Sequence, residues 1–413
     1  MLYLLKKYRL LIFAVILICV SGLWADDSVI ATIIVEESSG IQRDLEYIEC
    51  NIQVSIENLD NSPPKFIIEE IPSGLPVPCQ IFELTKEISK DKIFFKLIFP
   101  LSIGASEKNE YLLKQATSTI SINSDLRLEG SGFDLIVENR FYRADLSKSD
   151  LAEPKNHDSG QIRELLIKMG INQLLTNVED RLHWAPNFKR PDLEWYTTIA
   201  HWNSPAVYNL HKGPYLIKTV RKDLAPDHPE ISLTAVYRFY EDLPYFKFYS
   251  EMQMVEDVWL ELLRNDEMTM DSMFTHLAFQ RSSGKIVDIT FSERKELLEK
   301  QPIQNESPWI CFYNREKKYA FGSIRIQYSN LNQFGEPSPV YQPQTQIGEW
   351  LAGIKYWNRR LIHNQLTFVP RGSRYMEENA YLVFKMGNED KFEVIKYWVD
   401  RLHHPLEVEV RYH

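Results

Sequence analysis

The chain alternates apolar and polar residues with a period of two, in short runs that clusters of turn-forming residues separate. Before residue 130 the runs are VIATIIVEE, YIECNIQVSI, KFIIEEI, IFFKLIFPL and ATSTISIN, and the turn clusters are NLDNSPPK, PSGLPVP and IGASEKNE. Successive side chains of a strand point to opposite faces, so this alternation is typical of strands with one buried face. Short strands about ten residues apart predict an antiparallel β-sandwich of immunoglobulin-like size over residues 26–130.

Longer strands follow residue 130, of which GPYLIKTVR, KYAFGSIRIQY and EISLTAVYRFYEDLPYFKFYSEMQMV are the clearest. Pro244 interrupts the last run and cannot donate to a strand ladder, so we predict a hairpin turned at Glu241–Pro244. Only SERKELLEK and DKFEVIKYWVDRLHHP have a helical pattern, with Asp390 as a candidate cap and Pro405 as the terminator of the second. The sequence therefore predicts a mainly β protein with few helices, whose second, larger antiparallel domain spans residues 131–413 and carries a C-terminal helix.

The first 25 residues have the pattern of a secretory signal peptide. An apolar run over residues 10–20 follows Lys6, Lys7 and Arg9, and small residues precede Ala25. The run is too short to span a membrane comfortably, and Leu23 fits a cleavage site poorly, which leaves an uncleaved anchor as the alternative. We expect a secreted or periplasmic protein with no other membrane segment.

Cleavage would remove three positive charges and no negative ones, so the net charge would change from −10 to −13. Such a protein has no general attraction to nucleic acid, and an acidic ligand would need a local basic cluster. The mature chain keeps Cys50, Cys79 and Cys311, and an oxidising compartment would permit a Cys50–Cys79 bridge. The sequence contains no zinc-ligand pattern and no nucleotide or cofactor fingerprint, so it predicts no metal site and identifies no cofactor.

Aromatic residues are concentrated between Arg181 and Ser250, with 14 in 70 residues against 12% over the whole chain. Histidines, arginines and carboxylates are interleaved with these rings and continue to His276. Flat rings stack on the apolar faces of sugars, and fixed polar groups bind the hydroxyls, so the block favours a sugar-binding surface. The alternative for any single ring is the packed interior of a large β-sandwich.

Three segments supply candidate binding residues. The dipeptide His-Trp occurs twice, and in a strand the two side chains of each pair would point to opposite faces. The segment LLRNDEMTMDSMFTH groups a cation with carboxylates and an imidazole, whereas KYWNRR joins a ring to two guanidinium groups that suit carboxylate or sulfate recognition. The alternatives are packed rings, solvated turns and an ion-pair network with Glu377 and Glu378. The candidate substrate-binding residues are His183, Trp184, Trp202, Glu230, Asp271, Trp357, Arg359 and Arg360.

The segment EISLTAVYRFYEDLPYFKFYSEM resembles the paired central strands of galactose-mutarotase-like supersandwich domains. The segments VPCQIFE, FFKLIFP, YLLK, FDLIVENRFYRADL and SGQI are similar to the opening of exo-acting rhamnogalacturonan lyase-like proteins. The resemblance covers roughly residues 75 to 290 and includes no catalytic motif that aligns residue by residue. It implies that the large domain is a supersandwich and that the protein is carbohydrate-active, with a polysaccharide or oligosaccharide as its partner.

Three functions are compatible with these residues. A polysaccharide lyase acting on an acidic glycan would use Arg264 or Arg360 to neutralise the uronate, His201 or His276 as the base and Tyr196 as the acid. A glycoside hydrolase would use two carboxylates such as Glu230 and Asp271. A non-catalytic glycan-binding or scaffold protein would need only the aromatic face.

The geometric hypothesis is that His183, His201, Arg264 and His276 converge in one groove lined by Trp202 or Trp357. Its physical basis is that His and Arg are poor occupants of an apolar core between two sheets, so strand alternation should place them in the groove.

Overall fold

The structure is a computed structural model, and it describes residues 29–55, 65–87, 91–116, 118, 120–147, 160–177, 181–201, 207–225, 228–350 and 353–413. The predicted signal peptide lies outside these residues. Strands dominate the described part of the chain, where the α-helices are α2 (Arg294–Lys300) and α3 (Glu393–His403). The prediction of a mainly β fold with few helices is therefore confirmed.

The first of two compact units contains the residues up to Ile122 together with Leu406–His413. One sheet has the order β27-β1-β7-β3-β4, and a second has the order β2-β6-β5. Apolar residues of both sheets form a common core. The strands are β1 (Val29–Glu36), β2 (Arg43–Ser55), β3 (Phe66–Ile71), β4 (Pro76–Val77), β5 (Gln80–Glu87), β6 (Lys92–Ile103), β7 (Lys108–Gln115) and β27 (Glu407–Tyr412).

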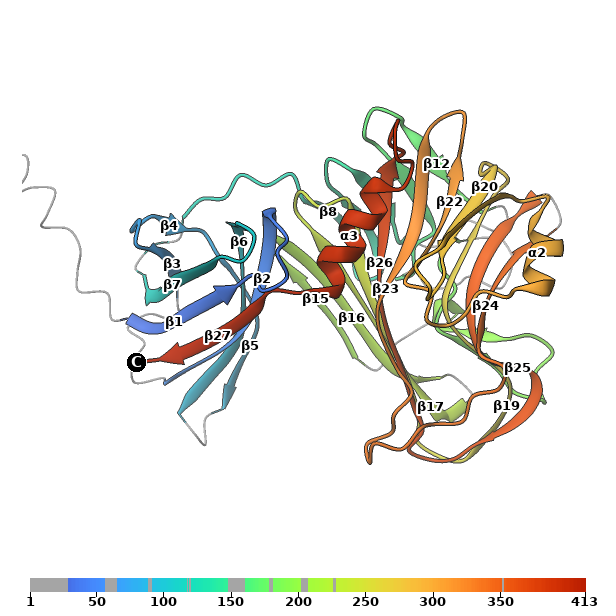
Figure 1. The fold of residues 1–413 in the computed structure, drawn as a ribbon. Helices are drawn as coiled ribbons and strands as arrows, with labels where there is room; N and C mark the ends of the chain where they lie inside the picture. Colours follow the sequence, from blue (N-terminus) through green and yellow to red (C-terminus); the bar gives the residue numbers. More distant parts are fainter. Residues whose placement is uncertain are drawn as a thin grey trace, which may run out of the picture. The chain divides into compact units, whose positions relative to one another are not determined.

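Two strands of this unit differ from the sequence prediction. The strand that pairs with β1 and β3 is β7, which begins within the predicted turn IGASEKNE and ends before the predicted strand ATSTISIN. The C-terminal strand β27 pairs with β1 in antiparallel register, with Ile33 opposite Val410, as Figure 1 shows for the red and blue arrows. Pairing between the two ends of the chain has no local sequence signal, because it depends on contacts between distant residues.

Cys50 and Cys79 are both free thiols, and so is Cys311. Cys50 lies in β2, whereas Cys79 immediately precedes β5, and β6 separates these strands in the sheet. Two strand spacings amount to roughly 9–10 Å, beyond the Cα separation that a disulfide bridges. The bridge that the sequence permitted is therefore not formed, and the Cys79 Sγ instead lies 3.5 Å from the Phe66 carbonyl oxygen.

The second unit, Asn123–Pro405, contains three sheets around one apolar core. The first has the order β12-β11-β10-β9-β8, the second β14-β13-β19-β25-β24 and the third β15-β16-β17-β18-β26-β23-β22-β20-β21. The strands of the first sheet are β8 (Arg127–Ser131), β9 (Asp134–Glu138), β10 (Tyr142–Asp145), β11 (Glu164–Ile167) and β12 (Gln173–Leu175).

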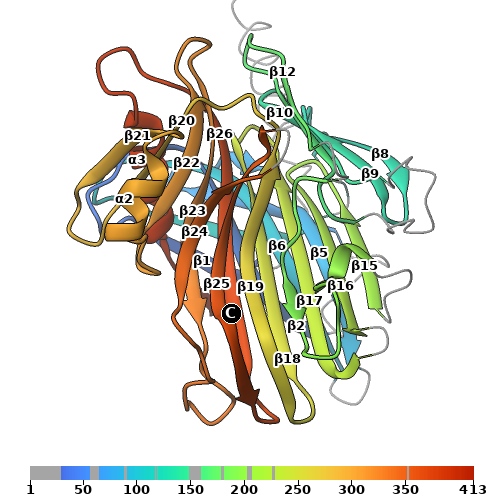
Figure 2. The ribbon, with the colours of Figure 1, turned by 90° about the vertical axis from the view of Figure 1, so that its right-hand side faces the viewer.

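The other two sheets enclose most of the core. Among the described residues, no helix is long and apolar enough to cross a membrane. The five-stranded sheet contains β13 (Asn187–Lys189), β14 (Thr197–Thr198), β19 (Val258–Met270), β24 (Gln344–Glu349) and β25 (Lys355–Val369). The nine-stranded sheet contains β15 (Val207–Lys212), β16 (Leu216–Ala225), β17 (His228–Tyr240), β18 (Tyr245–Met254), β20 (His276–Gln280), β21 (Ile286–Thr290), β22 (Trp309–Asn314), β23 (Tyr319–Ser329) and β26 (Arg374–Lys385). Figure 2 shows β24, β25 and β19 side by side.

The predicted hairpin turn and helices of this unit agree with the structure, whereas Asp390 does not cap α3, whose N-cap is Phe392 without a side-chain cap. The turn between β17 and β18 occupies residues 241–244, as Pro244 indicated. Helix α3 packs Ile395, Trp398 and Val399 inward and contacts β23 and β26. The Asp390 carboxylate accepts a hydrogen bond of 2.9 Å from the Phe392 backbone NH just before the helix.

Candidate functional site

A β-bulge in β19 determines how the charged segment RNDE is arranged. The register with β25 shifts between Asn265 and Met268, and Asp266 has a left-handed φ of +44°. Asp tolerates this conformation better than most residues because its short side chain bonds locally. The extra residue breaks the alternation, so the adjacent Asp266 and Glu267 side chains are both buried, with different partners.

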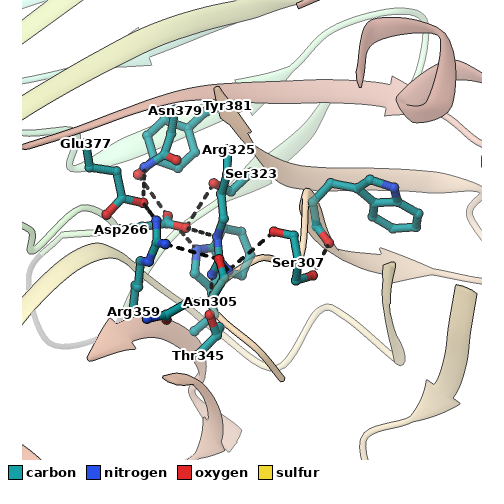
Figure 3. A network of polar contacts seen from close by, with 12 residues as sticks. Asp266, Asn305, Ser307, Ser323, Arg325, Thr345, Arg359, Glu377, Asn379 and Tyr381 are labelled. Carbon is teal, nitrogen blue, oxygen red and sulfur yellow. Dashed lines mark hydrogen bonds and ion pairs between the residues drawn. The ribbon is translucent and has the colours of Figure 1, made fainter. Parts of the chain in front are cut away.

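Asp266 is the centre of a polar network between the two large sheets, which Figure 3 shows. Its carboxylate accepts hydrogen bonds from Tyr381 Oη at 3.0 Å, Trp357 Nε1 at 2.9 Å and Ser323 Oγ at 3.0 Å. The Arg325 Nε lies 3.7 Å from the same carboxylate. A buried charge is tolerated when it is paired and hydrogen-bonded in this way.

A second buried ion pair continues the network to the surface. Arg359 Nη1 donates to Glu377 Oε1 at 3.1 Å, and its Nη2 donates to the Asn305 carbonyl oxygen at 3.1 Å (Figure 3). The Arg359 guanidinium also lies 4.1 Å from the ring centroid of Tyr328. Arg325 and Arg359 line a cavity of about 650 Å³, but their donors are largely used by protein acceptors. We therefore interpret this network as structural.

A different cleft lies on the other face of the five-stranded sheet, and we call it the Trp195 cleft. Its volume is about 420 Å³. The Trp195 side chain is 65% exposed. The Arg264 guanidinium carbon lies 5.1 Å from the ring centroid of Tyr196. The lining residues combine rings, carboxylates, cations and an amide, and they are Lys189, Glu194, Trp195, Tyr196, Glu261, Leu262, Arg264, Asn364 and Leu366.

Two arginines stand directly opposite each other beside this cleft. Arg264 of β19 and Arg360 of β25 are register partners, so their side chains lie on the same face of the sheet. Arg264 Nη1 pairs with Glu267 Oε1 at 2.9 Å. Arg360 is only 7% exposed, yet no carboxylate of the described residues forms an ion pair with it. The Glu267 carboxylate, which pairs with Arg264, acts on Arg360 only through a longer-range attraction. Like charges directly opposite each other destabilise a sheet, so a guanidinium held here without a directly paired carboxylate is a candidate anion site.

The surroundings of Arg360 make this site electrostatically unusual. Its Nε donates to Asn358 Oδ1 at 2.9 Å, and its Nη1 lies 2.5 Å from the ring nitrogens of His363. Burial and the neighbouring Arg264 lower the pKa of Arg360 to about 10. Burial, Arg360 and Arg264 lower the pKa of His363 to about 4, so the imidazole is neutral at pH 7 and can accept a hydrogen bond from Arg360 Nη1.

Of the four residues expected to converge, Arg264 lines this cleft, whereas His183 and His276 do not, and the side chain of His201 lies outside the described residues. His183 is fully buried between the sheets, where Tyr237, Phe248 and Tyr381 surround its ring. The expectation that a histidine avoids this core is wrong, because tyrosine hydroxyls satisfy both ring nitrogens: Nδ1 contacts Tyr237 Oη and Nε2 lies 3.4 Å from Tyr381 Oη. His276 belongs to the nine-stranded sheet, where its ring stacks on Tyr313 at 4.9 Å.

Three residues that were predicted to bind a sugar are packed inside the protein instead. Trp357 is fully buried in the core and therefore cannot stack on a sugar. Trp184 is 7% exposed, and its Nε1 donates to Thr269 Oγ1 at 2.7 Å. Arg359 belongs to the inner network, on the opposite face from Arg360, because successive strand residues alternate. For these residues the packed alternative describes the structure.

The remaining predicted residues lie apart from the cleft or outside the described part of the chain. Glu230 is nearly buried and pairs with Arg190. Asp271 follows the end of β19, where it accepts a hydrogen bond of 2.5 Å from Thr176 Oγ1. Trp202 and the side chain of His201 are outside the described residues.

Sequence reasoning missed Trp195, Glu194, Glu261 and His363. The signal for Trp195 was available: it forms an adjacent aromatic pair with Tyr196 in a segment bounded by proline and threonine residues. The signal for His363 was not, because its proximity to Arg264 results from pairing between β19 and β25.

The described residues contain no group of three or more His, Cys, Asp or Glu side chains that could hold a metal ion.

We expect the buried His183 to make the protein sensitive to acid. Burial lowers the pKa of His183 from 6.5 to about 3, so the neutral form stabilises the fold above pH 6.5 and this stability is lost as the pH falls towards 3. Between these values the wild type should lose about 1.4 kcal/mol more unfolding free energy per pH unit than His183→Gln. Urea unfolding across this pH range measures the difference. Equal slopes for the wild type and His183→Gln would contradict the expectation.

No protein-family model and no curated protein matches the sequence. Two solved structures from Enterococcus faecalis are similar in fold. One is a protein in glycosyl hydrolase family 38, with a TM-score of 0.53 and 11% identity over 92% of this chain and 47% of that chain. The other is an alpha-mannosidase from strain V583, with a TM-score of 0.54 and 11% identity over 92% of this chain and 46% of that chain. The chain thus spans less than half the length of these proteins, and at this identity the similarity shows a shared β-rich fold.

Proposed function

We propose that this chain is a carbohydrate-active protein that binds an acidic glycan in the Trp195 cleft. The observation that carries the proposal is the buried Arg360 guanidinium. It stands opposite Arg264 on the neighbouring strand and forms no ion pair with a carboxylate of the described residues. A uronate carboxylate or a sulfate ester would supply the missing negative charge. Guanidinium groups are suited to both, because their planar donors match the oxygen spacing.

The rings of the cleft support the same ligand class. Trp195 exposes a large flat surface, and Glu194 and Asn364 are polar groups of the same lining that could bind hydroxyl groups. Lys189 of this lining pairs with Glu261 at 3.2 Å. Sugar sites combine apolar faces with a few placed polar groups in this manner.

Replacing Trp195 by alanine tests the proposal. We expect Trp195→Ala to weaken the binding of oligogalacturonates and heparin-derived oligosaccharides roughly tenfold, since about 1.4 kcal/mol is a typical loss for a stacking contact. Isothermal titration calorimetry measures the affinity. Trp350→Ala is the matched control, because Trp350 is 58% exposed and does not line the cleft. If wild-type protein binds neither acidic series, or if both variants bind as wild type does, the proposal is wrong.

Hydrolysis is a second candidate, because Glu194 and Glu261 line the same cleft. Paired carboxylates flanking a glycosidic bond act as acid and as base or nucleophile. The fold that this chain shares with a glycosyl hydrolase family 38 protein and an alpha-mannosidase is compatible with this chemistry. We expect new reducing ends from a glycan panel with wild-type protein and none with Glu261→Gln. Binding without turnover would leave the non-catalytic function.

The lyase form of the proposal keeps Arg264 or Arg360 as the group that neutralises a uronate and Tyr196 as the acid. His363, which is neutral and adjacent to Arg360, is a better-placed base than His276, which belongs to another sheet. Lyase activity would produce unsaturated uronate products, which absorb in the ultraviolet. Absence of this signal on polygalacturonate and other uronate polymers would remove the lyase form and leave the binding proposal intact.

A further inference from the structure

A pair of exposed aromatic side chains lies further along the same two strands that bear the Trp195 cleft. Trp259 of β19 and Phe368 of β25 are register partners, and their ring centroids are 5.2 Å apart. Trp259 is 50% exposed and Phe368 is 43% exposed. Two large rings that remain in water side by side on neighbouring strands indicate a contact surface, because folding alone would favour covering them.

Strand alternation places this pair on the face of the cleft. Val258 and Leu260 belong to the buried core, so Trp259 and Glu261 point outward. Glu261 lines the Trp195 cleft, and so does Leu366, which is two residues from Phe368 and is 50% exposed. One apolar side chain, Leu366, thus connects the cleft with the ring pair along β25.

We propose that Trp259 and Phe368 form a second sugar-binding subsite, which holds residues of the same glycan chain whose acidic unit occupies the Trp195 cleft. This inference rests on the proposed function. From Trp259 to Arg264 the strand extends roughly 16 Å, a distance that a single sugar ring does not span. The protein would consequently recognise an oligosaccharide or polysaccharide and discriminate against a free uronic acid.

The chemistry of the flanking residues selects a glycan over another protein or a lipid surface. Glu261 lies between the ring pair and the arginines, and Asn364 and Gln365 are exposed next to Leu366. Alternating rings and hydrogen-bonding groups match a chain of sugars, which presents apolar faces and hydroxyl edges in turn. A hydrophobic partner would leave these polar groups without water or hydrogen bonds.

The test compares the affinities of oligogalacturonates and heparin-derived oligosaccharides of increasing length. For wild-type protein we expect the affinity to rise from the disaccharide to the hexasaccharide. Trp259→Ala should bind the disaccharide as wild type does but lose roughly tenfold in affinity for the hexasaccharide, because only the longer chain reaches the second subsite. Trp350→Ala, which removes an exposed ring elsewhere, should keep the full dependence on length.

Two results would rule out the second subsite and leave the proposal for the Trp195 cleft unaffected. One is a Trp259→Ala variant that binds every length as wild type does while Trp195→Ala is impaired. The other is a wild-type dimer in sedimentation experiments that Trp259→Ala dissociates, since the rings would then serve self-association. If the wild type binds neither series at any length, the proposed function itself fails, and the subsite fails with it.

Discussion

Replacing Arg360 by methionine is expected to stabilise the protein and to weaken acidic-glycan binding at the same time. The substitution removes a buried positive charge that stands opposite Arg264 and has no carboxylate partner among the described residues. Relief of this repulsion should add up to about 1 kcal/mol to the unfolding free energy. Loss of charge-assisted hydrogen bonds should reduce the affinity roughly 10- to 100-fold. Urea unfolding and calorimetric titration measure the two effects.

The adjacent residue provides a matched control on the opposite face of the same strand. Arg359 is as buried as Arg360 but pairs with the fully buried Glu377 at 3.1 Å. Arg359→Met leaves that carboxylate without its cation, so it should destabilise the protein by about 3–5 kcal/mol. If Arg360→Met also destabilises by several kcal/mol, Arg360 has a structural role, and the anion-site interpretation is contradicted.

Replacing Asp266 by alanine is expected to lower the unfolding free energy by about 3–5 kcal/mol. The side chain is completely buried, and its removal leaves the Trp357, Tyr381 and Ser323 donors without their acceptor and Arg325 without its counter-ion. Urea unfolding at neutral pH measures the change. Asp266→Asn should recover part of the loss, since the amide oxygen still accepts hydrogen bonds.

A surface carboxylate shows what an ion pair contributes when water is present. Glu296 pairs with Lys300 one helical turn away, and the two side chains are 82% and 68% exposed. Glu296→Ala should change the unfolding free energy by less than about 0.5 kcal/mol. If Asp266→Ala were equally mild, the inner network would not hold the two large sheets together as we infer.

Much of the local structure was predictable from neighbouring residues. The period-two runs predicted a mainly β fold, Pro244 indicated the hairpin turn, and the two helical patterns correspond to α2 and α3. The structural features that the sequence did not predict arise from long-range strand pairing or from local irregularity of a strand. The strand β27 pairs with the other end of the chain, and the bulge at Asp266 disrupts an alternation that sequence analysis takes as regular.

The candidate site was predictable only in part, for the same physical reason. Arg264 and Tyr196 do meet in one cleft, and Arg360 stands beside Arg264. His183 and Trp357 do not join them, because alternation separates the residues of a strand into two faces without revealing which face a second sheet will cover. His183 was assigned to a groove by its polarity, whereas tyrosine hydroxyls from other strands make its burial possible.

The amino-acid sequence by itself determined the class of fold, the hairpin turn and the positions of the helices, since these depend on residues close together in the chain. Only the tertiary structure decided which face of β19 and β25 is open, that Arg360 stands opposite Arg264 without a carboxylate partner among the described residues, and that Trp259 and Phe368 continue the same face. These features arise from strand register and sheet packing, which depend on interactions between residues far apart in the sequence.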